Sequence, residues 1–163
     1  MITRGVLYVH SAAKAFCPHV EWAVANVIGV PVSMDWTDQP AAPGTLRAEY
    51  SWQGPQGTGA RLASALRGWV HLRYEVSEEP SFGVDGGRWF HTPSLGICHA
   101  VTDVHGNLLI RADQVLYALE HGYDLVSLRH KLAVALAEPW DDELEPFRCA
   151  GAGAPVRWLH QVG

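Results

Sequence analysis

The residues best placed to do chemistry are a cysteine and two histidines near the start of the chain. Cys17 directly precedes Pro18, which is favoured in the first turn of a helix, so the sequence predicts Cys17 at a helix N-cap. A thiol there faces the positive end of the helix, which lowers its pKa. His19 follows two residues later and His10 ends the preceding predicted strand, so either imidazole could pair with the sulfur. A thiolate–imidazole pair is the minimum for nucleophilic catalysis, and the alternative is a small buried cysteine without chemistry.

A second candidate site is a glycine-rich segment that precedes a predicted helix. The first N–H groups of a helix attract an anion, and an arginine can add a charged fork to a phosphate or carboxylate. The candidate ligand-binding residues are Gly57, Thr58, Gly59 and Arg61. The segment has neither the lysine of a P-loop nor the glycine pattern of a dinucleotide-binding fold. The alternative is an ordinary strand-to-helix turn in which Thr58 is the N-cap.

No residue spacing predicts a metal site. The chain contains 9 histidines and 3 cysteines, but Cys-x-x-Cys, His-x-x-x-His and His-Glu-x-x-His do not occur. An acidic run between Glu138 and Glu145 is expected to cap a short helical turn after Pro139 and otherwise to face solvent. We therefore predict no metal and no cofactor. Because no complete catalytic constellation is present, the sequence favours a protein without enzymatic activity.

The elements that must position these residues are clearest before residue 80. Apolar side chains alternate along predicted strands at 4–10, 30–37, 45–53 and 71–77. One helix is predicted from Pro18 to a stop at Gly29, and another carries Leu62, Ala65, Leu66 and Trp69 on one stripe. The order strand, helix, strand, strand, helix, strand is the split βαβ, or ferredoxin-like, pattern of an antiparallel sheet. The predicted fold class is therefore α+β, with a ferredoxin-like βαββαβ core.

The second half is predicted to be an extension packed on this core. A short strand is expected at 88–91, a β-hairpin around His105-Gly106, and two helices capped by Asp113 and Asp124. A last strand is expected at 156–160. This half has six basic and ten acidic side chains and is the acidic part of the chain. We predict one compact domain over 1–163, with the core at 3–80 and the extension at 81–163.

Composition and charge limit the function classes. The chain has 163 residues, of which 48% are hydrophobic and 18% charged, as expected for a folded domain. A net charge of −5 argues against a broad nucleic-acid interface. The longest apolar run, 132–137, is too short to span a membrane, and the chain starts without a signal-peptide pattern. Widely spaced cysteines do not form a disulfide framework, so we expect a cytoplasmic protein.

Several segments together resemble a known family. The most specific are CPHVEWAV at 17–24, GTGARLASALRGW at 57–69 and APVRWLH at 154–160. From about Arg4 to His160, the chain resembles an actinobacterial family of unknown function. Members of that family are often encoded near fatty-acid-synthesis genes, so the resemblance implies a link to acyl-carrier or acyl-thioester metabolism. It supplies no catalytic residues for this chain.

Three function classes remain, in order of preference. The first is a non-enzymatic binding or accessory protein, whose partner is another protein or a second copy paired through the sheet edge. Arg61, Arg67 and Arg73 could meet the acidic surface of an acyl carrier protein. The second is a sensor domain for a small anionic ligand at the Gly57–Arg61 helix start. The third is an acyl-transfer or thioester enzyme built on Cys17 with His19 or His10.

Overall fold

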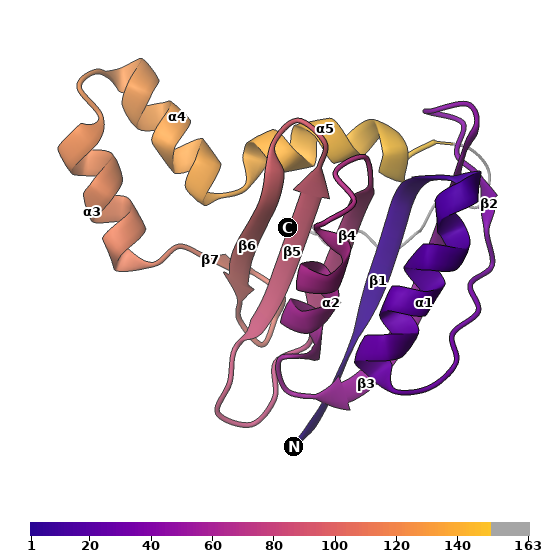
Figure 1. The fold of residues 1–163 in the computed structure, drawn as a ribbon. Coiled ribbons are helices and arrows are strands. Elements are labelled where there is room, and N and C mark those ends of the chain that lie inside the picture. The colour runs from indigo at the N-terminus through magenta and orange to yellow at the C-terminus, as the bar shows by residue number, and fades with distance from the viewer. Residues whose placement is uncertain (151–163) are drawn as a thin grey trace.

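The fold is built around one antiparallel sheet, seen in a computed structural model that describes residues 1–150. Within these residues the seven strands have the order β2-β3-β1-β4-β5-β6-β7 (Figure 1). They are β1 Ile2–Ala13, β2 Thr37–Asp38, β3 Thr45–Pro55, β4 Arg73–Glu78, β5 Gly86–Thr92, β6 Gly96–Thr102 and β7 Leu108–Leu109. Every neighbouring pair is antiparallel. The chain is therefore α+β, with a sheet larger than a simple split βαβ, because β5, β6 and β7 extend it.

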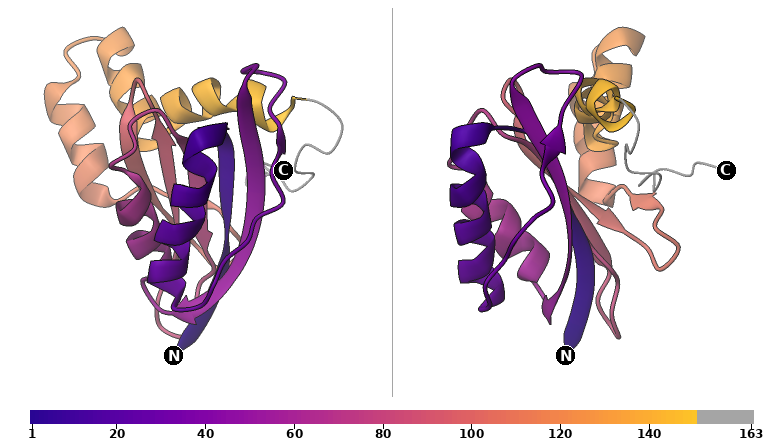
Figure 2. Two further views of the ribbon diagram at one scale, coloured as in Figure 1. Left: turned by 45° about the vertical axis from the view of Figure 1, so that its right-hand side comes forward. Right: turned by 90° about the vertical axis from the view of Figure 1, so that its right-hand side faces the viewer.

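The helices cover the two faces of the sheet unequally. They are α1 Cys17–Ile28, α2 Thr58–Leu66, α3 Ala112–His121, α4 Leu125–Ala135 and α5 Glu138–Arg148, and a short 3-10 turn, Lys14–Phe16, precedes α1. Figure 2 shows α1 and α2 on one face and α5 on the other. The antiparallel pair α3 and α4 projects away from the sheet (Figure 1). Of these helices, α5 is thus the one that lies on the second face of the sheet.

The main apolar core lies between the sheet and the first two helices. Its fully buried side chains come from β1, β4, α1 and α2, and include Leu7, Val9, Val20, Val24, Leu62, Leu66, Tyr74 and Val76. Side chains alternate between the faces of a strand, so Tyr8 and His10 of β1 point to the other face. They are buried as well. Both faces of β1 are therefore covered.

The predicted first helix is confirmed at its C-terminus and in its buried face, but it begins at Cys17, so Phe16 is the N-cap and the prediction of Cys17 as N-cap is wrong. Pro18 lies in the first turn, and Gly29 ends the helix at φ 87°, a left-handed conformation that glycine adopts without strain. Val20, Ala23 and Val24 are buried. In α2 the predicted stripe is right for Leu62 and Leu66 but wrong for Ala65, which is exposed while Ala63 is buried.

The predicted strand at 30–37 is wrong in its secondary structure. Only Thr37 and Asp38 form a strand, β2, although the alternation of buried and exposed side chains before it is real. The carboxylate of Glu21 replaces a strand partner, because its Oε1 accepts hydrogen bonds from Met34 N at 2.8 Å and Trp36 Nε1 at 2.9 Å. A helix side chain therefore satisfies groups that a neighbouring strand would otherwise bind.

The second half has more structure than the sequence predicts. The strand at 88–91 extends over Gly86–Thr92, and the hairpin around Gly106 is present as β6 and β7. Asp124 is the N-cap of α4 as predicted, but Arg111 rather than Asp113 is the N-cap of α3. The acidic run forms a full third helix, α5, where a short turn was predicted. The strand expected at 156–160 lies outside the described residues, and no helix within 1–150 has the length and apolarity to cross a membrane.

Candidate functional site

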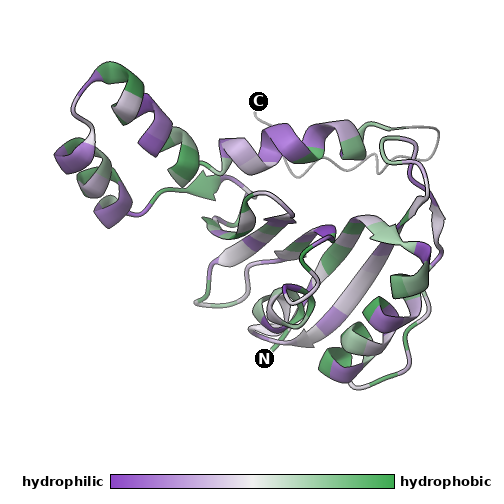
Figure 3. Ribbon diagram, turned by 45° about the horizontal axis from the view of Figure 1, so that its top comes forward, coloured by the Kyte–Doolittle hydropathy of each residue, from purple (hydrophilic) through white to green (hydrophobic). Residues whose placement is uncertain are grey.

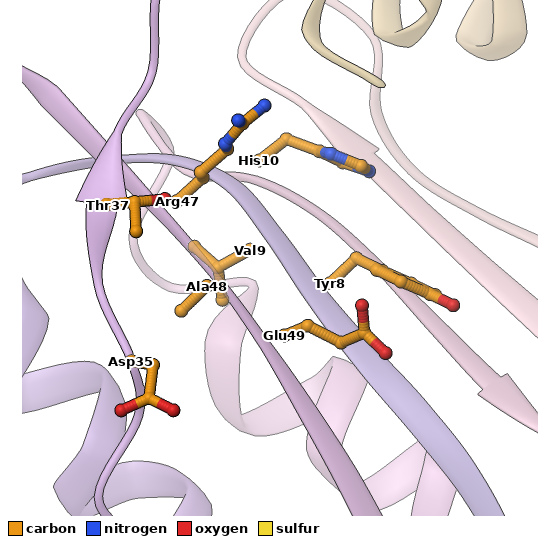
Figure 4. Close-up of a pocket in the computed structure, with 8 residues that line it drawn as sticks. All are labelled: Tyr8, Val9, His10, Asp35, Thr37, Arg47, Ala48 and Glu49. Atoms are coloured by element: carbon orange, nitrogen blue, oxygen red, sulfur yellow. The ribbon is translucent and has the colours of Figure 1, made fainter. Parts of the chain in front are cut away.

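A polar cavity of about 250 Å³ opens beside the first and third strands. Tyr8 and His10 of β1 and Arg47 of β3 form its buried floor. Its other lining residues are Val9, Asp35, Thr37, Ala48 and Glu49. Figure 4 shows the Arg47 guanidinium on the side of His10 and the Glu49 carboxylate on the side of Tyr8. The strand register explains this arrangement, because Tyr8 pairs with Glu49 and Val9 with Ala48.

His10 of the cavity floor belongs to a buried cluster of charged side chains, which we call the ion cluster. The Glu75 carboxylate, 1% exposed, accepts a hydrogen bond from His10 Nε2 at 2.5 Å. Arg148 of α5 donates to the same carboxylate from Nη2 at 2.5 Å and from Nε at 2.9 Å. Arg88 of β5 approaches it at 3.3 Å. Three basic side chains from three elements thus converge on one carboxylate, and they fix its position.

Helix α5 completes this cluster from the second face of the sheet. Arg148 also forms an ion pair at 2.8 Å with Asp141, which lies on the same helix. Gln39, in the segment before β3, connects β1 with α5. Its Nε2 donates to the carbonyl of His10 at 2.7 Å and to that of Phe147 at 3.1 Å. Leu144, on the same helix face, is fully buried. The helix therefore acts as a cover whose inner face is charged as well as apolar.

The charges in the cluster keep one another ionised. Burial alone would raise the pKa of the Glu75 carboxyl, but the hydrogen bonds and charges of His10 and Arg148 hold it well below its usual value. Burial would lower the pKa of Arg148, and Glu75 and Asp141 raise it above its ordinary value. Glu75 therefore stays an anion, so His10 Nε2 must be the donor in their hydrogen bond.

The glycine-rich segment does bind a carboxylate, which belongs to the protein itself. Glu78 Oε1 accepts from Gly57 N at 2.7 Å and Oε2 from Gly59 N at 2.8 Å. Gly57 is the N-cap, with φ 84°, and Thr58 is the first helical residue, so the prediction of Thr58 as N-cap is wrong. A Cβ on Gly59 would lie 2.8 Å from Glu78 Oε2, so only glycine permits this approach.

The remaining residue of this segment is engaged locally. Arg61 Nη2 donates to Thr58 Oγ1 at 2.9 Å, and Thr58 Oγ1 donates to the carbonyl of Pro55 at 2.6 Å. Thr58 is fully buried. An external anion at Gly57–Arg61 would have to compete with Glu78. Binding of a ligand there stays a prediction.

The structure does not bring the three residues of the thiol hypothesis together. Cys17 is the first residue of α1 and packs in the apolar core, where its thiol lies 3.7 Å from the Ala13 carbonyl. Burial and the nearby Glu21 raise the pKa of the Cys17 thiol, which is opposite to the predicted activation. His19 is exposed and lies against Phe16, whereas His10 belongs to the ion cluster.

The helices α3 and α4 form a helical hairpin that exposes apolar side chains at its far end. We call four of these residues the hairpin tip: Leu119, Tyr123, Leu125 and Val126. The last three are 89%, 83% and 79% exposed. Figure 3 shows hydrophobic residues at this end of the hairpin, away from the sheet. Exposed apolar residues gathered in this way mark interaction surfaces.

The sequence patterns did not predict the ion cluster, although the spacing of its α5 residues indicates a shared helix face. Glu75 lies on the polar face of the predicted fourth strand, and such a face normally points to solvent. Asp141, Leu144 and Arg148 follow a spacing of three and four residues, which places them on one helix face. Within residues 1–150, no group of three or more histidine, cysteine or acidic side chains is arranged to hold a metal ion.

Comparison with known proteins gives one match. The model of a family described as a protein of unknown function (DUF3145) matches residues 6–161. Neither curated proteins nor solved structures give a significant match. The match covers nearly the whole chain, including the strands that form the cavity and the helices of the hairpin.

Proposed function

We propose, for a chain that belongs to this family of unknown function, that it is a non-enzymatic accessory protein that binds another protein through the α3–α4 hairpin. The observation that carries this proposal is the exposed hairpin tip. A monomer gains nothing from leaving Tyr123, Leu125 and Val126 in water, and burial of each against a partner would contribute roughly 1.5–3 kcal/mol. Of the candidate catalytic residues, Cys17 and His10 are buried and engaged inside the protein, and His19 is exposed.

The charge beside the tip indicates the kind of partner. Helix α4 contains Arg129, His130 and Lys131 and no carboxylate. Arg129 lies four residues after Leu125, and His130 four after Val126, so these apolar and basic pairs share one face of the helix. Arg129 and His130 are exposed. Glu120 and Asp124 are also exposed beside the tip, at the turn between the two helices. The α4 face, rather than the turn, therefore suits a protein surface with an apolar centre and acidic residues around it.

Finer assignments remain part of the proposal. The strand order β2-β3-β1-β4 with antiparallel neighbours supports a ferredoxin-like unit in the first half. We also propose a cytoplasmic location, which the few and widely spaced cysteines favour. The resemblance implies, in addition, a link to acyl-carrier metabolism in actinobacteria. An acyl carrier protein is one acidic partner of the kind that α4 would accept.

Site-specific photo-crosslinking in the source organism tests the partner. A photo-reactive phenylalanine at Val126 should capture a protein with an acidic surface. The same probe at Ser64, exposed on α2, is the matched control and should not capture it. The captured protein, once purified, should bind the Arg129→Glu variant at least about tenfold more weakly than wild type, a change of about 1.4 kcal/mol. Arg67→Glu, at the C-cap of α2, should leave the affinity unchanged.

Three outcomes would overturn this proposal. A second copy of the chain captured at Val126 would make the tip a dimer contact. Equal capture at Val126 and Ser64 would remove the specificity of the surface. No capture at Val126, with the variant folded, would mean that the tip has no protein partner.

A further inference from the structure

The described part of the chain ends beside the cavity between β1 and β3. Helix α5 ends at Arg148, and two residues later the carbonyl of Ala150 accepts a hydrogen bond from Nη1 of Arg47. Arg47 is 7% exposed and lines the cavity. The residues that follow Ala150 therefore start at the floor of this cavity.

The cavity lies on the second face of the sheet, which α5 also covers. Tyr8, His10, Arg47 and Glu49 alternate along β1 and β3 with side chains that pack in the main core, so they point to the other face. Figure 2 shows α5 on that face, where it packs against β5 and β1. The hydrogen bond from Arg47 then leads the chain on to β3, so the segment after Ala150 begins where this cover ends.

Two carboxylates at the opening of the cavity have no basic partner in the described chain. Asp35 and Glu49 are exposed, and neither forms an ion pair within residues 1–150. The segment 151–163 contains Arg157 and His160 and no acidic side chain. An arginine can hold a carboxylate through two parallel N–H groups. Charge complementarity therefore favours this segment as the occupant of the cavity.

The same segment contains one large aromatic side chain, that of Trp158. A tryptophan buries about 150–250 Å² and brings one N–H donor, which the polar residues of the cavity can accept. The cavity of about 250 Å³ corresponds to roughly eight water molecules at about 30 Å³ each. It admits one large side chain, but not a helix with a diameter of about 10–12 Å.

The chain between Ala150 and Trp158 is long enough to turn back to the cavity. Its eight residues span up to about 26–29 Å when extended, and two glycines and a proline among them favour turns. The sequence predicts a strand at 156–160, and neighbours in a strand point to opposite sides. Trp158 inside the cavity therefore leaves Arg157 at the opening, beside the two carboxylates.

We propose that residues 151–163 dock on the second face of the sheet, with the Trp158 side chain in the cavity and Arg157 against the carboxylates at its opening. The family model matches residues 6–161 and so includes most of this segment. The docked segment closes the cavity to small solutes and extends the cover that α5 begins. It uses no residue of the hairpin, so it is independent of the proposed protein partner.

Photo-crosslinking within the purified full chain tests this docking. A photo-reactive phenylalanine in place of Trp158 should form a crosslink to a residue that lines the cavity, such as Tyr8 or Glu49, and mass spectrometry of a digest locates it. The same probe at Tyr123, which is 89% exposed at the hairpin tip, is the matched control and should not reach these residues. A mixture of chains with natural and heavy nitrogen shows whether each crosslink lies within one chain.

A charge exchange tests the contact at the opening. Arg157→Glu should lower the yield of the crosslink from position 158 at least about threefold, a change of about 0.7 kcal/mol, because it brings like charges together. Adding Glu49→Arg to this variant should restore the yield, since opposite charges then meet again. Glu49 is exposed, so its replacement leaves the fold intact. Glu120→Arg, at an exposed position of α3, is the control and should restore nothing.

The proposal fails in any of three cases. Crosslinks from position 158 that reach none of the residues lining the cavity would mean that the segment docks elsewhere or not at all. Crosslinks that form only between chains would mean that it docks on a second copy. An unchanged yield in Arg157→Glu would refute the charge contact at the opening.

Discussion

Replacing Glu78 with alanine should destabilise the start of α2. The carboxylate binds two backbone N–H groups, those of Gly57 and Gly59, and no other described side chain accepts from them. Hydrogen bonds to a charged group contribute about 1.5 kcal/mol each at the lower end of their range, and the helix dipole adds about 0.5 kcal/mol. We therefore expect the free energy of unfolding to fall by about 3–4 kcal/mol. For a chain of this length that lowers Tm by about 10 °C.

Urea unfolding followed by tryptophan fluorescence measures this loss. The signal sums all 7 tryptophans of the chain, so it follows unfolding of the whole protein. One of them, Trp89, lies against Gly59, where an added Cβ would come within 2.7 Å of its ring. Glu79→Ala is the matched control, since the neighbouring carboxylate forms an exposed ion pair with Arg4. Exposed pairs of that kind contribute little, so the control should unfold like wild type.

Added formate gives a second readout. Its carboxylate can occupy the space that Glu78→Ala leaves at the α2 start, so formate should raise the unfolding midpoint of this variant and not that of wild type. The same experiment measures how well the Gly57–Arg61 segment binds an external anion. Equal midpoints for Glu78→Ala and Glu79→Ala would refute the capping role of Glu78. Equal stabilisation of wild type by formate would place the anion elsewhere.

Two further predictions concern the buried groups. Glu75→Gln should lower the free energy of unfolding by about 3–5 kcal/mol in urea titrations, because it leaves buried arginines without their anion. The folded-state pKa of Glu75 is below its unfolded value, so wild type should lose stability as the pH falls below about 4.3. If the free energy of unfolding of Glu75→Gln fell as steeply with decreasing pH as that of wild type, this prediction would be contradicted. Cys17 is buried and should react with iodoacetamide in the native protein far more slowly than the exposed Cys149, as peptide mass mapping can show. The pKa of both thiols is raised, by burial at Cys17 and by the hydrogen bond with Glu145 at Cys149, so exposure decides the difference. Equal rates would mean that Cys17 is accessible.

Local patterns predicted local structure well. The first helix, its glycine stop and the Asp124 cap are set by neighbours within a few residues, so the sequence indicates them directly. The alternation of Val32, Met34 and Trp36 correctly predicts which side chains face inward. It could not reveal that Glu21, from the preceding helix, would take the place of a strand partner.

The candidate site depends on contacts that such patterns do not report. A polar strand face normally faces water, and Glu75 is buried because Arg148, 73 residues further along the chain, brings α5 over it. Likewise, the anion expected at the α2 start is Glu78, which comes from the next strand. The glycine-rich sequence predicts that this helix start binds an anion, but not that the anion is a side chain of the protein itself. The cavity beside His10 and Arg47 arises only when β1 and β3 pair.

Within residues 1–150 the sheet ends on both sides in strands of two residues, β2 Thr37–Asp38 and β7 Leu108–Leu109. Each pairs with only two residues of its longer neighbour, so the outer side of β3 beyond Arg47 has no strand paired to it among these residues. Glu49 is exposed on this stretch, and charged side chains at a sheet edge act against pairing with another molecule. Tyr123, Leu125 and Val126, by contrast, lie outside the sheet, at the start of α4 and in the turn before it. A partner can therefore bury these apolar side chains without pairing with a strand of the sheet.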